Sequence, residues 1–351
     1  MNEISRKLKK EIKIGNIFIG QNNPIKIQSM TNTKTKDIKN TIDQIIQLEK
    51  IGCEIIRVAV VDLEDAKAIS EIKKSINIPI VADIHFDYNL AIESIKNGAD
   101  KIRINPGNIG NEEKIKAIID EAKLFNIPIR IGVNSGSIEK HIIEKHNGPT
   151  IDAMIESLDN HIKIFEKHEF YNIVLSIKTT NIYDTIKVNQ ILNEKYDYPL
   201  HIGLTESGTI TSGTIKSSFV LGTLLSQNIG DTIRVSLTGD PKNEIIVAKE
   251  ILSMTNHLDK PTLISCPTCG RTSYDMLKIV NEVETFLNTM NKKITVAVMG
   301  CVVNGPGEAK HADIGIAGGN KKAVLFKKGQ IIKTLDEKDI LQELIKEIKN
   351  S

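Results

Sequence analysis

Apolar residues in the first 256 positions recur with two alternating spacings. Runs rich in β-branched residues, such as Ile55–Val60, are followed by longer segments in which apolar residues are spaced by three and four positions. The first pattern is typical of a buried strand and the second of an amphipathic helix. Asp37 can cap the first helix and Gly52 can end it. The pattern therefore predicts regular alternation of strand and helix, preceded by a short hairpin at Ile12–Gly20.

An internal repeat reinforces this alternation. Gly52-x-Glu-x-Ile-Arg-Val is matched by Gly98-x-Asp-x-Ile-Arg-Ile, so consecutive strand–helix pairs are similar in sequence. Eight strands, each followed by a helix, over about 250 residues are typical of a TIM-type (β/α)8 barrel, with an open doubly wound sheet as the alternative. We expect an α/β barrel at residues 1–256 and a smaller α+β domain at 257–351. The expected strands are Ile25–Met30, Ile55–Val60, Ile78–Asp83, Lys101–Asn105, Ile129–Gly132, Ile173–Lys178, Pro199–Gly203 and Thr232–Ser236.

Composition excludes several classes of function. The chain has 351 residues, of which 40% are hydrophobic and 26% charged, and its formal net charge is +2. This balance gives no overall attraction to nucleic acid or to a membrane. No apolar run of membrane-spanning length occurs, and the charged segment Met1–Lys13 lacks the apolar core of a secretory signal. Neither a dinucleotide-binding glycine motif nor a P-loop is present. We therefore expect a cytoplasmic protein in which any anion site is local.

Polar and basic residues cluster at the expected carboxyl ends of the strands. In a TIM barrel these ends form the mouth that carries the active site. Several cations converging on one partly desolvated rim require a ligand with more than one negative charge, and arginine binds phosphate oxygens in a bidentate fashion. The sequence thus predicts a diphosphate site. The strand-end residues are Arg57, Asp83, His85, Arg103, Asn105, Arg130, Asn134, Lys178, Glu206 and Ser236.

Four of these residues have a structural reading beside the functional one. His85 is a candidate catalytic residue or a hydrogen-bonded structural histidine, and Asp83 can simply pair with an arginine. Glu206 could orient a substrate hydroxyl or relay a proton, with cation pairing as the alternative. Ser236 could donate to a phosphate or serve the turn that follows it.

Three of the four cysteines lie in the expected second domain, in Cys266-Pro-Thr-Cys269 and at Cys301, shortly before Glu308. C-x-x-C places two thiolates on one turn, and Cys301 can add a third soft ligand. This spacing leaves zinc, an iron–sulfur cluster and an inert or redox pair all open. Cys53 stands alone and is expected to fill core space.

Seven segments, in order, resemble the family of bacterial two-domain 4-hydroxy-3-methylbut-2-en-1-yl diphosphate synthases. They begin at Ile25, Val81, Lys101, Ile129, Leu204, Ser265 and Met299, and include Leu204-Thr-Glu-Ser-Gly and Met299-Gly-Cys-Val-Val-Asn-Gly-Pro-Gly-Glu. The resemblance implies an iron–sulfur oxidoreductase of isoprenoid biosynthesis acting on 2-C-methyl-D-erythritol 2,4-cyclodiphosphate. It also implies a homodimer and flavodoxin or ferredoxin as electron donor. The implied ligands of a [4Fe-4S] cluster are Cys266, Cys269, Cys301 and Glu308.

The chemistry agrees with this resemblance. Reductive ring opening with loss of water needs electrons delivered singly, which zinc cannot do, and a carboxylate at the fourth iron is more exchangeable than a thiolate. Asn105 and Asn134 would add hydrogen bonds to a diphosphate held by the cations. Two alternatives remain: a barrel enzyme for another phosphorylated substrate with zinc on the three cysteines and His311, and a non-enzymatic iron–sulfur sensor or scaffold.

Barrel geometry predicts a site shared between two chains. The helix expected at Pro241–Met254 runs back from the mouth, so the chain leaves the barrel at the opposite end. The short linker to Cys266 then favours a head-to-tail homodimer in which each cluster domain covers the partner's barrel.

Overall fold

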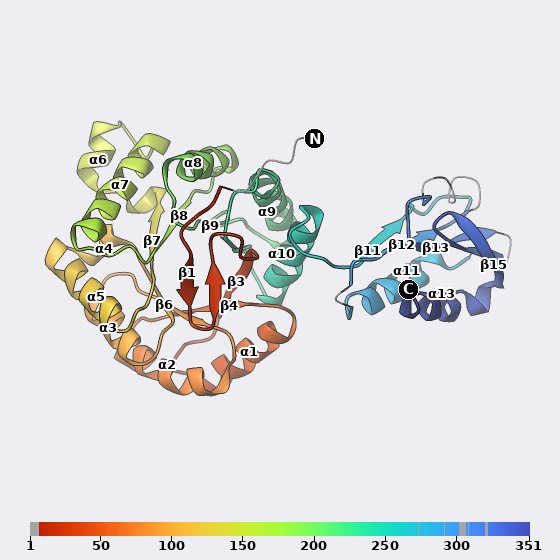
Figure 1. Ribbon diagram of the computed structural model, residues 1–351, viewed down its shortest axis with the longest axis horizontal. Helices are drawn as coiled ribbons and strands as arrows, with labels where there is room; N and C mark the ends of the chain where they lie inside the picture. The colour runs from red at the N-terminus through yellow and green to blue at the C-terminus, as the bar shows by residue number, and fades with distance from the viewer. Residues whose placement is uncertain (1–6, 273, 291, 302–306, 308, 320–321) are drawn as a thin grey trace. The chain divides into compact units, whose positions relative to one another are not determined.

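The computed structural model describes residues 7–351 apart from 273, 291, 302–306, 308 and 320–321. The chain divides into two compact units, Met1–His257 and Leu258–Ser351, each of which is described by itself (Figure 1). Among the described residues, no helix combines the length and the apolar character needed to span a membrane.

Eight parallel strands form the centre of the first unit. Their order is β8-β7-β6-β5-β4-β3-β10-β9, and an isolated parallel bridge between Leu175 and Leu200 joins the two end strands. The predicted (β/α)8 barrel is therefore confirmed, and the open-sheet alternative is wrong. The strands are β3 (Lys26–Met30), β4 (Ile55–Ala59), β5 (Ile80–Asp83), β6 (Lys101–Ile104), β7 (Ile129–Asn134), β8 (Ile173–Lys178), β9 (His201–Ile202) and β10 (Thr232–Ile233).

Helices surround the strands (Figure 1). Several begin at a side-chain cap: the Asp37 carboxylate accepts from Asn40 N, as predicted, and Asp62 accepts from Glu64 N and Asp65 N. Such caps satisfy backbone donors that have no partner inside the helix. The main helices are α1 (Ile38–Lys50), α2 (Leu63–Ser75), α3 (Tyr88–Lys96), α5 (Glu112–Leu124), α7 (Ile151–Lys167), α8 (Ile182–Lys195), α9 (Ile210–Leu225) and α10 (Lys242–Met254), with shorter α4 (Pro106–Ile109), η1 (Ser135–Ser137) and α6 (Lys140–Lys145).

Two of the barrel strands, β9 and β10, are much shorter than predicted. The ladders of β9 and β10 cover only two residues each, although apolar residues continue to Leu204 and Val235. The predicted strands were too long because apolar residues mark buried positions, and a buried residue need not belong to a hydrogen-bonded strand ladder. Arg234 N still donates to Ile202 O beyond the assigned pairs.

A hairpin of β1 (Ile12–Ile14) and β2 (Ile17–Ile19) closes the amino-terminal end of the barrel. Its buried isoleucines pack against Ile55, Val81 and Val174 at the starts of β4, β5 and β8. This apolar floor leaves the carboxyl ends of the strands as the open face.

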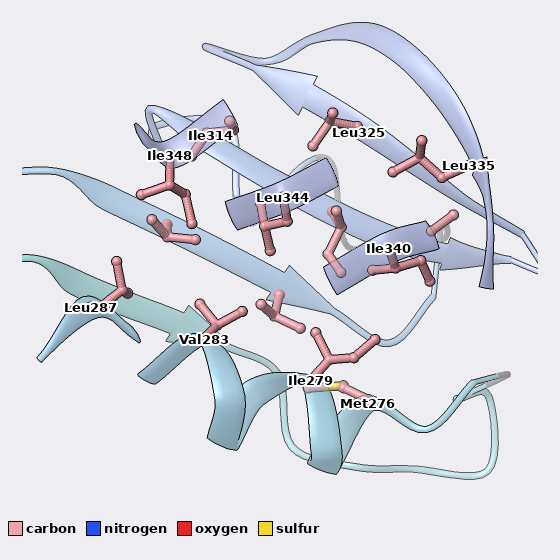
Figure 2. Packing of buried hydrophobic residues seen from close by; sticks show 14 of the residues in the cluster. Met276, Ile279, Val283, Leu287, Ile314, Leu325, Leu335, Ile340, Leu344 and Ile348 are labelled. Carbon is pink, nitrogen blue, oxygen red and sulfur yellow. The ribbon is translucent and has the colours of Figure 1, made fainter. Parts of the chain in front are cut away.

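The second unit is a five-stranded sheet with order β11-β12-β13-β14-β15. The first three strands are parallel and the last two antiparallel. Figure 2 shows side chains of α11 and α13, among them Val283 and Leu344, converging with those of the sheet. The elements are β11 (Thr262–Ser265), α11 (Met276–Leu287), β12 (Thr295–Met299), β13 (Ile314–Gly319), β14 (Lys322–Lys327), β15 (Gln330–Asp336), η2 (Glu337–Asp339) and α13 (Ile340–Lys349).

The core of this unit yields a stability prediction. Leu344 on α13 is fully buried, so Leu344→Ala should lower the free energy of unfolding by about 2–5 kcal/mol because it leaves a cavity. Leu277→Ala on α11, where the side chain is 63% exposed, is the matched control and should change it by about 0.5 kcal/mol or less. Denaturant titration measures both, and equal effects would contradict the assigned core.

Candidate functional site

A cavity of about 180 Å³ opens at the carboxyl ends of the barrel strands. Eight of the ten predicted strand-end residues line it, and Asn105 and Glu206 do not. The lining residues are Arg57, Asp83, His85, Arg103, Arg130, Gly132, Asn134, Ser176, Lys178, Thr205, Arg234 and Ser236, which makes His85 and Ser236 part of the cavity with the predicted cations.

Strand alternation and two glycines bring the long side chains together. Residues two apart on a strand point to the same face, so Arg130, Gly132 and Asn134 of β7 all face inward. A Cβ on Gly132 would lie 3.4 Å from Arg103 Nε, and one on Gly203 would lie 3.0 Å from Lys178 Nζ. The two glycines therefore leave the space that these cations occupy.

Asp83 is the only carboxylate among the described residues that line the cavity. Its Oδ1 accepts from Arg103 Nη1 at 3.0 Å, and its Oδ2 lies 3.7 Å from Arg57 Nε and 3.5 Å from His85 Nε2. Burial would raise the pKa of Asp83, but the arginine charges and the contact with His85 outweigh it and hold that pKa well below its usual range. Asp83 is thus an anion that partly balances the surrounding cations.

The cations exceed the carboxylates that reach them. Beyond Asp83, the described carboxylate within ion-pair distance of this group is Glu244, 3.6 Å from Arg234 Nη2. Burial lowers the pKa of Arg57 to about 10, although Asp83 opposes that shift. Burial and the neighbouring arginines also lower the pKa of Arg130 and of Lys178 well below their usual values. The cavity is therefore electrostatically prepared for an added anion.

Three arginine nitrogens in this group are buried without a hydrogen-bond partner. They are the Nε atoms of Arg103, Arg130 and Arg234. Leaving a buried charged donor unsatisfied costs about 1–3 kcal/mol or more. The chain contains six arginines in all, and four of them line this one cavity. Such a concentration of planar donors matches a ligand rich in phosphate oxygens.

Several predicted residues take positions other than the cavity wall. Asn105 is buried, and its Oδ1 caps α4 by accepting from Gly107 N at 3.2 Å. Glu206 is exposed on the loop after β9 in the left-handed backbone conformation, with φ 51°. His85 reaches the cavity from a half-exposed position, 3.2 Å from Arg103 Nη1. Direct roles for Asn105 and Glu206 stay predictions.

Sequence reasoning missed Arg234, Ser176 and Thr205. The signal was present, because Arg234 precedes the predicted Ser236 by two residues and Ser176 precedes Lys178 by two. Period-two alternation would have placed both on the inward face. Sequence reasoning also missed His201, which is fully buried and contacts Lys178.

Lys101 lies beneath this cationic group. It is fully buried on β6, and its Nζ is 3.3 Å from Gln28 Oε1. Burial and the charges of Arg130 and Arg57 lower the pKa of Lys101 well below its ordinary value. The lowered pKa favours the neutral amine over the ammonium form.

The second unit presents its cysteines at the ends of neighbouring parallel strands. Cys266 follows β11 and Cys301 follows Gly300 after β12, and Gly300 N donates to Cys266 Sγ at 3.1 Å. Backbone donors of this kind stabilise thiolates that bind iron. Cys269 is exposed, and none of these three cysteines takes part in a disulfide, so this donor set fits a metal cluster.

Other parts of the predicted metal site are less complete. Glu308 lies outside the described residues, and His311 is exposed. Within the described ranges, no three His, Cys, Asp or Glu side chains are already grouped around one point as metal ligands would be. Cys53 is buried in the barrel, and burial raises the pKa of its thiol to about 12. It therefore has the inert character expected of core filling.

Comparison with known families covers both units. The GcpE TIM-barrel domain matches residues 9–249, and the GcpE protein C-terminal domain matches residues 262–350. A curated 4-hydroxy-3-methylbut-2-en-1-yl diphosphate synthase (flavodoxin) from Caldicellulosiruptor saccharolyticus is 58% identical over 339 residues, which are 97% of this chain and 98% of the relative. The protein of the same name from Caldanaerobacter subterraneus subsp. tengcongensis is 59% identical over 344 residues, covering 98% of this chain and 97% of the relative.

Solved structures support the barrel fold alone. The N-acetylneuraminic acid synthetase of Leptospira borgpetersenii has a TM-score of 0.52 at 15% identity, covering 72% of this chain and 91% of that one. The 7,8-dihydropteroate synthase of Vibrio fischeri has a TM-score of 0.50 at 15% identity, covering 70% of this chain and 98% of that one.

The buried amine of Lys101 gives a pH-dependent prediction. Because burial lowers the folded pKa of Lys101, the folded chain binds this proton more weakly than the unfolded chain does, and the resulting cost to stability disappears as pH rises toward the unfolded pKa. Lys101→Met should therefore raise the free energy of unfolding at pH 7 by about 1–4 kcal/mol. The gain should shrink by at most about 1.4 kcal/mol per pH unit toward pH 10.

Urea titrations at pH 7, 8 and 9 measure this difference. Lys96→Met, at an exposed position of α3, is the matched control and should show little change at any pH. A Lys101→Met gain that is absent, or that grows with pH, would mean that the pKa of the buried amine is not lowered.

Proposed function

The chain belongs to the GcpE family and catalyses the reaction of its curated relatives, synthesis of 4-hydroxy-3-methylbut-2-en-1-yl diphosphate, and we propose that the barrel cavity is where the substrate diphosphate binds. The reaction is the two-electron reductive ring opening and dehydration of 2-C-methyl-D-erythritol 2,4-cyclodiphosphate. The observation that carries the proposal is the set of buried, unpartnered Nε donors of Arg103, Arg130 and Arg234. A diphosphate would satisfy them and offset the excess positive charge.

The polar residues at the rim would orient the rest of the substrate. Asn134 and Ser236 line the cavity and can donate to phosphate or sugar oxygens, and Asn105 has a buried Nδ2 without a partner. We assign His85 and Glu206 as candidate proton-transfer residues. His85 lies at the cavity edge, and the left-handed backbone of Glu206 is the kind of local strain that accumulates at functional sites.

The second unit would hold the redox centre. Cys266, Cys269, Cys301 and Glu308 are the proposed ligands of a [4Fe-4S] cluster, and Gly300 N supplies a hydrogen bond to the first of these thiolates. When bound, such a cluster supplies single electrons and an exchangeable iron position. The curated relatives are named for flavodoxin, and we propose flavodoxin, with ferredoxin as the alternative, as the electron donor. The zinc alternative with His311 has no support from this family.

The catalytic unit is proposed to be a homodimer with shared sites. After α10 the chain returns to the amino-terminal end of the barrel, where His257 Nε2 lies 3.2 Å from Asn228 Oδ1, shortly before the start of β10. The chain thus leaves the barrel at the end opposite the cavity. The cavity of one protomer would then be completed by the cluster domain of its partner.

An anaerobic turnover assay tests the function as a whole. The purified protein with its reconstituted cluster should convert the cyclodiphosphate to 4-hydroxy-3-methylbut-2-enyl diphosphate with a chemical reductant. Lack of product despite an intact cluster spectrum would contradict the proposed reaction.

The anion site predicts weaker binding on loss of a cation. Arg130→Met and Lys178→Met should each weaken binding of inorganic pyrophosphate by about 1.5–3 kcal/mol, because each removes charge-assisted hydrogen bonds. Isothermal titration calorimetry measures the loss. Lys123→Met, exposed on α5, is the control and should bind like the wild type. Unchanged affinity in both cavity variants would exclude this cavity as the diphosphate site.

The cluster ligands predict a selective loss of iron. Cys301→Ser should lose the intact cluster and its visible absorption while the barrel stays folded. Cys53→Ser should keep the cluster, since the Cys53 thiol already donates to Ile55 O at 3.2 Å and a hydroxyl would retain that partner. Iron analysis and circular dichroism measure both. Full iron content in Cys301→Ser would remove this residue from the ligand set.

The shared site predicts complementation between two inactive chains. A heterodimer of Arg103→Ala and Cys301→Ser has one composite site with both defects and one with neither, so part of the activity should return on mixing. Native mass spectrometry verifies that mixed dimers form. Mixed dimers without activity would show that each site is built from a single chain.

A further inference from the structure

A buried histidine beside the cavity has no assigned role in the reaction. His201 on β9 is fully buried, and its Nε2 lies 3.1 Å from Lys178 Nζ on β8. Its Nδ1 lies 2.8 Å from Thr232 Oγ1 on β10. The ring therefore bridges the two strands that flank β9 and contacts one of the proposed diphosphate ligands directly.

The hydrogen-bonding capacity of the partners determines the tautomer of His201. With an anion in the cavity Lys178 is an ammonium group, which donates three hydrogen bonds and accepts none. Nε2 must then be the acceptor, so the ring proton lies on Nδ1 and is donated to Thr232 Oγ1. Burial lowers the pKa of His201 well below its ordinary value, and the nearby charges of Lys178, Arg130 and Arg57 act in the same direction, which favours the neutral ring.

The strand provides room for this contact. Gly203 lies two residues after His201 and on the same face of the chain. A Cβ there would lie 3.0 Å from Lys178 Nζ and would overlap the carbonyl oxygen of Arg234. The glycine therefore allows the amine to lie between the cavity and the histidine.

We propose that His201 is a positioning residue: its neutral Nε2, oriented by Thr232, accepts one hydrogen bond from Lys178 and directs the other two donors of that ammonium group toward the bound diphosphate. The inference rests on the proposed anion site. It adds to that site a residue that does not touch the substrate and acts through Lys178.

Calorimetry with inorganic pyrophosphate on the full-length protein tests this role. His201→Leu should weaken binding about tenfold, because Lys178 loses the acceptor that orients it. His201→Gln should stay within about threefold of the wild type, since an amide oxygen can replace Nε2 as acceptor. In a Lys178→Met background His201→Leu should have no further effect, whereas a purely structural role would multiply the two losses.

The outcomes separate this inference from the anion site itself. No pyrophosphate binding by the wild type would overturn both. Binding that is weakened by Arg130→Met but unaffected by His201→Leu would overturn the inference alone. If His201→Leu fails to fold, Thr232→Val gives a second test. This variant preserves side-chain shape and should also weaken binding, because it removes the partner that orients the His201 ring.

Nitrogen-15 NMR of labelled histidine should show a neutral ring with its proton on Nδ1 in the pyrophosphate complex. A cationic ring or the other tautomer would contradict the role.

Discussion

Excess positive charge buried at one end of the barrel is the constraint on which the rest of this structure depends. Arg57, Arg103, Arg130, Lys178 and Arg234 line a cavity that contains a single described carboxylate, Asp83. Mutual repulsion among these groups opposes folding, and burial adds to the cost. The barrel has to compensate elsewhere, and the arrangement of the surrounding residues follows from that requirement.

Three features provide the compensation. The apolar floor formed by the N-terminal hairpin supplies stabilising burial directly under the charged layer. Asp83 contacts the arginines of two strands, and Glu244 holds Arg234 from the other side. Burial lowers the pKa of Lys101 and of His201, which lie among the cations, and so favours their neutral forms and reduces the repulsion. A diphosphate would complete this balance, so substrate binding and relief of buried charge would be the same event.

The cysteines of the second unit are not fully buried: Cys266 and Cys301 are partly buried, and Cys269 is exposed. The hydrophobic residues of this unit pack between the helices and the sheet, whereas Cys266 and Cys301 follow the carboxyl ends of adjacent parallel strands. A redox centre on this separate unit, as proposed above, would leave the barrel cavity free to be lined for an anion.

The sequence by itself determined the barrel, because the alternating spacings of apolar residues show which residues of each strand and helix face the core. It also determined most of the cavity, because the carboxyl ends of barrel strands lie together at one end of the barrel. It also identified Cys266, Cys269 and Cys301 as candidate ligands by their spacing and residue type. Only the tertiary structure decided that Asn105 caps a helix, that Glu206 lies outside the described cavity wall, and that His201 contacts Lys178. The physical reason is that strand alternation fixes the face on which a side chain lies, whereas hydrogen-bond partners and charge balance depend on distances between strands far apart along the chain.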